Sequence, residues 1–75
     1  MREIAPGIVV DPAIKGGKPL IKGTRISVEL ILGRLASGMS YDELAVEYEI
    51  TKEQILATLK YAALALSEEE IRVVQ

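Results

Sequence analysis

The residues best suited to contact a ligand lie on one predicted helix, over residues 52–66. Its outer side combines a cation with hydrogen-bonding side chains: Lys52, Gln54, Thr58 and Tyr61. Amide and hydroxyl groups can contact base edges in the major groove of DNA, and lysine can pair with phosphate. This side of the helix is therefore a candidate nucleic-acid interface, although it also carries the acidic Glu53. A helix with a purely structural role is the alternative.

A second group of candidate ligands lies in the glycine-rich segment Gly16–Arg25, GGKPLIKGTR. Residues 15–25 contain four cations, three glycines and no acid. Exposed backbone N–H groups beside Lys and Arg bind phosphate and carboxylate, which makes Lys18, Lys22 and Arg25 candidate anion ligands. Arg25 is the first choice because its planar guanidinium can bind either group through two hydrogen bonds. The alternatives are a solvated turn and an internal ion pair between Arg25 and Glu29.

The residue types restrict the chemistry of the chain. It has neither cysteine nor histidine, so a disulfide, a thiolate metal site and an imidazole base are unavailable. Its carboxylates are numerous, but they fall on the outer sides of predicted helices with no partner that would tune them for proton transfer. We therefore expect no enzyme activity, no catalytic residue, no metal site and no cofactor.

The helix over residues 52–66 is the second half of a helix–turn–helix pattern. Two capping boxes, each a hydroxyl residue followed three positions later by Glu or Gln, occur in this region: Ser40–Glu43 and Thr51–Gln54. They predict helix starts for segments over about residues 41–48 and 52–66. Apolar residues then recur at helical intervals along the second helix, at Ile55, Leu59, Ala62 and Leu66.

A third helix precedes this pair. Ser27 is a suitable N-cap and Gly38 a suitable C-terminal stop for a helix over about residues 28–37. The three helices predict a mainly α single domain over residues 1–75, in which residues 67–75 form a tail.

Ahead of the helices, β-branched residues predict a short β segment. Two strands, near residues 8–10 and 19–21, would form a ribbon that must pack on the helices or on another subunit, because it is too small to be stable alone. With the glycine-rich turn this segment occupies residues 8–25. Residues 1–5 are expected to fray before a turn at Pro6-Gly7.

Apolar residues are more abundant than one small core requires. They make up 49% of the 75 residues, and a chain of this length has little interior in which to bury them. Leu30, Leu56 and Leu64 fall outside the predicted core stripes, and we expect them to form a homodimer interface. For Leu30, an exposed leucine without a contact is the alternative.

Charge is distributed unevenly. The net charge is −2, but residues 1–34 carry six cations and three acids, whereas residues 35–75 carry three cations and eight acids. Nucleic-acid binding would therefore rely on cations of the N-terminal half. No apolar run has the length of a membrane span and no signal-peptide pattern is present, so we expect a cytoplasmic protein without membrane contact.

The order of these motifs resembles a known family. Asp11-Pro12 is followed by Gly17-Lys18-Pro19 and by Gly23-Thr24-Arg25-Ile26, then by a helix that ends near Gly38 and an acidic helix–turn–helix. From about Ile8 to Ala63 the chain resembles the prokaryotic domain-of-unknown-function family 433. The resemblance implies a homeodomain-like helix–turn–helix domain with a short N-terminal β segment. It also implies an antitoxin role beside a small PIN-like ribonuclease, without established catalytic residues.

Two functions follow as expectations. The first is a DNA-binding, antitoxin-like regulator that acts as a homodimer on double-stranded DNA and binds a PIN-like toxin protein. The alternative is a protein–protein interaction or dimerisation module that does not bind DNA. The acidic C-terminal half and the surplus apolar residues favour this alternative.

Overall fold

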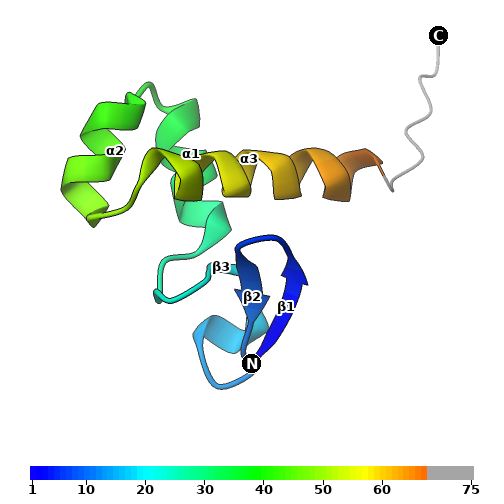
Figure 1. Ribbon diagram of the computed structural model, residues 1–75. Helices are drawn as coiled ribbons and strands as arrows, with labels where there is room; N and C mark the ends of the chain where they lie inside the picture. The colour runs from blue at the N-terminus through cyan, green and yellow to red at the C-terminus, as the bar shows by residue number, and fades with distance from the viewer. Residues whose placement is uncertain (68–75) are drawn as a thin grey trace, which may run out of the picture.

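The chain folds into a small three-stranded antiparallel sheet followed by three helices (Figure 1). The strands β1 (Arg2–Ala5), β2 (Ile8–Val10) and β3 (Leu20–Ile21) lie in the order β1-β2-β3. The helices are α1 (Val28–Ala36), α2 (Tyr41–Tyr48) and α3 (Lys52–Ser67). The structure is a computed structural model that describes residues 1–67, so the predicted tail lies outside the described residues beyond Ser67.

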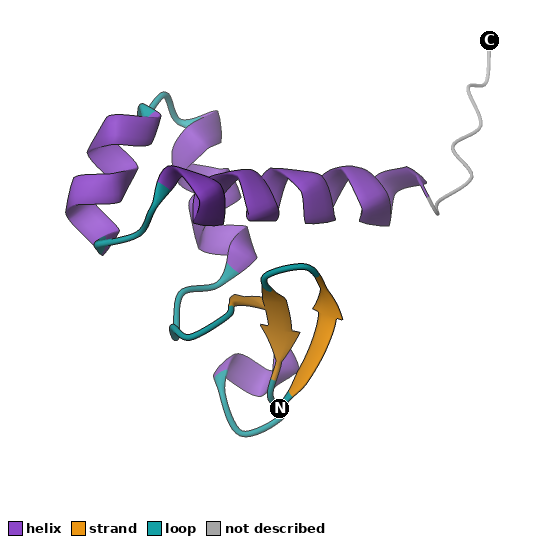
Figure 2. Ribbon diagram, viewed as in Figure 1, coloured by secondary structure: helices purple, strands orange, loops and turns teal. Residues whose placement is uncertain are grey.

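Figure 2 shows how the two parts are arranged. The longest helix, α3, runs across the helical part, with α1 and α2 beside its first turns and the sheet below its middle. The sheet and the helices are also tied by backbone hydrogen bonds: the N–H of Val28, at the start of α1, donates to the carbonyl of Pro19 at 3.0 Å. The sheet is thus fixed to the helices, as a ribbon of this size requires.

The helices begin where their capping residues predict. The Ser27 hydroxyl accepts from the Leu30 N–H at 3.1 Å. Both predicted capping boxes form, because the hydroxyl and the carboxylate or amide each reach the other residue's N–H: Ser40 with Glu43, and Thr51 with Gln54. The observed helix ranges differ from the expected ranges by no more than one residue at either end.

The expectation that residues 1–5 fray is wrong. Arg2 pairs with Val10 and Glu3 with Val9, which makes β1 an edge strand. The turn from β1 to β2 includes Gly7 at φ +79°, where a Cβ atom would lie 3.3 Å from the Ala57 Cβ on α3. Glycine at this position therefore allows both the left-handed turn and its close approach to the helix.

The core is aliphatic and joins the sheet to all three helices. One cluster contains a residue from β3, one from each helix and one from the α2–α3 connection: Ile21, Ile31, Leu44, Ile55 and Ile50. A single polar side chain is fully buried among the residues described, that of Thr58 on α3. No helix in the structure has the length and apolar character to cross a membrane.

The connection from α2 to α3 depends on a left-handed residue. Glu49 follows α2 with φ 54° and ψ 45°, and its N–H donates to the carbonyl of Ala45. This conformation closes the last turn of α2, but a residue with a Cβ atom adopts it at a cost that glycine largely avoids.

We therefore expect Glu49→Gly to raise the free energy of unfolding by about 0.5–1 kcal/mol, because glycine removes the steric strain at this turn. Urea denaturation measures the change. Glu47→Gly is the matched control two residues earlier, inside α2, and should lower the free energy of unfolding by about 1 kcal/mol. An equal decrease in the free energy of unfolding for Glu49→Gly and Glu47→Gly would show that the turn is not strained.

Candidate functional site

Two of the three predicted anion ligands in the glycine-rich segment are engaged in ion pairs. The Lys18 Nζ lies 2.8 Å from the Glu29 carboxylate, and the Lys22 Nζ lies 2.9 Å from the Glu3 carboxylate. These lysines lower the pKa of both carboxyl groups, and their hydrogen bonds to the carboxylates are the largest cause. At Glu3, a hydrogen bond from the Gly7 N–H lowers the pKa further. An incoming phosphate would have to compete with an ionised carboxylate at each lysine.

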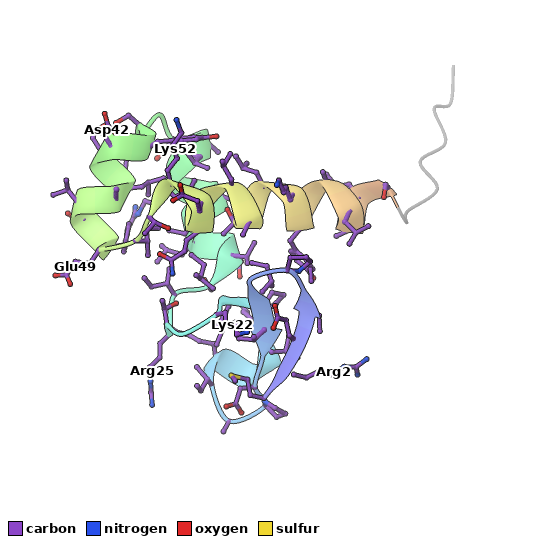
Figure 3. The ribbon with its side chains drawn as sticks, in the orientation of Figure 1. Arg2, Lys22, Arg25, Asp42, Glu49 and Lys52 are labelled. Atoms are coloured by element: carbon purple, nitrogen blue, oxygen red, sulfur yellow. The ribbon has the colours of Figure 1, made fainter. Side chains whose placement is uncertain are left out.

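Arg25 occupies a different environment. Its loop is ordered by Thr24, whose hydroxyl donates to the Ile21 carbonyl at 2.8 Å and accepts from the Ile26 N–H at 3.0 Å. Within residues 1–67, Arg25 forms no ion pair, and Figure 3 shows its side chain pointing away from the domain. The alternative in which Arg25 pairs with Glu29 is wrong, because Lys18 holds that carboxylate.

The side of α3 that was predicted to contact DNA bases does not have all the predicted residues on its surface. The placement of Thr58 on the outer side of the helix is wrong: its side chain is fully buried, and its hydroxyl donates to the Ile55 carbonyl at 2.7 Å. Gln54 is half-buried, and its amide oxygen accepts from the Thr51 N–H at 2.8 Å in the capping box. Thr58 therefore cannot contact a base without unfolding, and Gln54 would have to give up its cap.

The remaining candidates lie apart. Lys52 is exposed at the start of α3, and Figure 3 shows it far from Arg25, which lies near the sheet end of the molecule. Tyr61 is half-buried and lines a groove of about 120 Å³ between α3 and the β1–β2 turn, together with Leu64 and Pro6. The structure thus divides the predicted nucleic-acid ligands among separate parts of the surface.

The surface beside the start of α3 is acidic. The helix α2 and its C-cap carry Asp42, Glu43, Glu47 and Glu49, all exposed, and α2 contains no cation. The backbone N–H of Ser40 donates to the Glu43 carboxylate at 2.9 Å and lowers its pKa, so this group stays ionised. DNA approaching α3 from this side would meet several like charges.

The three leucines predicted at a homodimer interface differ in exposure. Leu56 is 37% exposed and Leu64 is 49% exposed, both on α3, whereas Leu30 on α1 is half-buried. Leu64 lines the groove beside the β1–β2 turn, and Leu30 lines a separate hollow with Gly33 and Arg34. Leu30 and Leu64 thus line different hollows.

One exposed apolar residue is not among the apolar positions that the sequence pattern predicts for the core. Val46 on α2 is 82% exposed and lines an open groove with Met39. Its exposure could have been predicted from helical geometry, because a residue two positions after Leu44 lies about 160° around the helix from it. Within the described part of the chain, no group of three or more acidic side chains is arranged to hold a metal ion.

Comparison with known proteins places the chain in a family. A family model described as "Protein of unknown function (DUF433)" matches residues 8–62. A crystal structure of a DUF433 member protein from Anabaena variabilis is similar, with a TM-score of 0.75 and 27% sequence identity. That similarity covers 83% of this chain and 62% of the other, so this chain spans less than two thirds of the crystallised protein. No curated protein matches the sequence significantly. The chain belongs to the DUF433 family of proteins of unknown function.

Proposed function

We propose that this domain is an antitoxin-like regulator that acts through protein contacts, as a homodimer that binds a protein partner. The observation that carries the proposal is the exposure of three leucines on α3: Leu56 at 37%, Leu64 at 49% and Leu66 at 57%. Burying such side chains against a second protein is favourable, at about 25 cal/mol for each Å² of apolar surface. The resemblance to the family suggests a small PIN-like ribonuclease as the partner.

The charges near the helix pair support a protein partner over DNA. The exposed carboxylates of α2 lie beside the first turn of α3, and Thr58 is buried. Lys18 and Lys22 are already paired with carboxylates. A protein surface can match this combination of acidic and apolar areas, whereas a phosphate backbone cannot.

Light scattering and sedimentation should therefore show a dimer at tens of micromolar, and Leu64→Glu should convert it to a monomer. Burial of the exposed half of Leu64 from two symmetric copies would contribute about 1.5–3 kcal/mol, so its loss should weaken dimerisation by about 10-fold or more.

Val46→Glu is the matched control, because it places the same charge at an exposed apolar residue on α2. It should leave the mass of the dimer unchanged. A monomeric wild type, or an unchanged mass after Leu64→Glu, would reject the dimer. Co-purification with the PIN-like protein tests the partner separately.

DNA binding is the second candidate, and the α2–α3 arrangement favours it. Two helices joined by Glu49–Thr51 with a left-handed turn, and packed with α1, are consistent with a homeodomain-like helix–turn–helix. Arg25 is an available cation for a phosphate contact, since it is exposed and forms no ion pair within residues 1–67.

For this candidate we expect Arg25→Gln to weaken binding to the upstream DNA of its own gene. The slope of the logarithm of affinity against the logarithm of salt concentration should flatten by about one unit, because one phosphate contact is lost. Gel shifts at several salt concentrations measure both effects, with thermal unfolding as the control for folding. If the wild-type protein does not shift the DNA at low salt, DNA binding is rejected and only the protein-binding role remains.

A further inference from the structure

The outer side of α2 carries an apolar groove whose central residue has no role in the core. Val46 is 82% exposed, more than any other large apolar residue between positions 2 and 67. The groove has a volume of about 430 Å³ and is lined by Val46, Met39, Asp42, Glu43 and Glu47. Because Val46 has carboxylates on both sides of it along the helix, the groove has an apolar floor and an acidic rim.

Part of this surface is unfavourable for folding, although Glu43 completes the capping box of α2 and Met39 packs against the core. Glu43 and Glu47 are four residues apart, a spacing at which like charges on a helix repel. Glu47 and Glu49 lie at the C-terminal end of α2, where the helix dipole disfavours negative charge, and the last turn contains no basic residue. Glu49 is also in the left-handed conformation. A cationic partner would relieve these repulsions.

One cation that interacts with this rim, Arg34, already has a hydrogen-bond partner within the chain. The Arg34 guanidinium donates to the Tyr48 hydroxyl at 2.9 Å, and its pKa is raised by that hydrogen bond first and only weakly by Glu47. No ion pair joins any of the α2 carboxylates to another residue of the described part. Figure 3 shows Asp42 and Glu49 at opposite ends of α2, both directed outward.

We propose that this groove binds a basic segment of a protein partner, through one aliphatic anchor flanked by lysines or arginines. The anchor packs on Val46 and Met39, and the flanking cations pair with Asp42, Glu43 and Glu47. Charge complementarity selects this occupant, since the rim is wholly acidic and the floor apolar. The inference rests on the proposed role in binding a protein partner and adds the chemistry of that partner.

Fluorescence anisotropy tests the inference with a labelled peptide of about 14 residues, about four turns if it is helical, in which one central leucine is flanked by lysines. We expect Val46→Glu to weaken binding at least about tenfold, as loss of one buried aliphatic contact would. A purely electrostatic attraction predicts the opposite, because the variant adds a negative charge. Equal or tighter binding by Val46→Glu would therefore overturn the inference.

Two controls separate this site from the α3 interface. Glu47→Gln should weaken peptide binding and reduce its salt dependence, whereas Leu64→Glu should dissociate the dimer and leave peptide binding unchanged. Loss of peptide binding in Leu64→Glu would place the site on α3 and overturn the inference. The dimer test decides the proposed function independently of this result. Circular dichroism confirms that each variant is folded.

Discussion

Thr58→Lys is expected to abolish the cooperative thermal unfolding of the domain. The Thr58 side chain is fully buried on the side of α3 that faces the core, so a lysine there would be overpacked and its ammonium would lose its water. Burying an unpaired charge costs several kcal/mol, and a domain of this size has a total stability of about 4–11 kcal/mol. Thermal unfolding followed by circular dichroism measures the effect.

Two further variants test whether the burial of Thr58 causes the loss of cooperative unfolding. Glu53→Lys introduces the same side chain at an exposed position of α3 and should unfold cooperatively. Thr58→Val replaces the hydroxyl, which donates to a carbonyl of its own helix, with a methyl group, so the free energy of unfolding should change by about 1 kcal/mol or less. If Thr58 instead contacted DNA, Thr58→Lys would be folded and would bind DNA more tightly. That result would overturn the observed orientation of α3.

The helices were predictable because their determinants are local. Ser27 caps α1, and the Ser40–Glu43 and Thr51–Gln54 boxes begin α2 and α3 through residues three positions apart. Such signals need no knowledge of the rest of the fold. The same locality explains why β1 was missed, since Arg2–Ala5 has no strand pattern of its own and becomes a strand only by pairing with β2.

The candidate site was harder to predict because side-chain partners and burial depend on packing. Lys18 pairs with Glu29, eleven positions away, and this contact removes the carboxylate from Arg25. Thr58 is polar, yet its hydroxyl is satisfied within the helix and can therefore be buried. Helical spacing does carry a signal for its burial, because Thr58 lies three positions after Ile55 and four before Ala62, on the side of α3 that the apolar residues define.

Ile31→Ala is expected to lower the free energy of unfolding by about 2–5 kcal/mol, a large part of the total for a domain of this size. Ile31 is fully buried on α1 and packs in one cluster with Ile21 of β3, Leu44 of α2 and Ile55 of α3. Truncation would leave a cavity where the sheet meets all three helices. Urea denaturation at fixed protein concentration measures the loss, because the stability of a dimer depends on concentration.

Leu30→Ala is the matched control on the preceding residue of α1. Leu30 is half-buried and lies outside the core cluster, so its truncation should cost clearly less, about 1 kcal/mol. If Leu30 contacts a second copy, this smaller loss should grow with protein concentration, whereas the loss from Ile31→Ala should stay the same at every concentration. Equal losses for the two variants would mean that α1 does not present Ile31 to the core, and the packing of α2 and α3 against the sheet would need a different explanation.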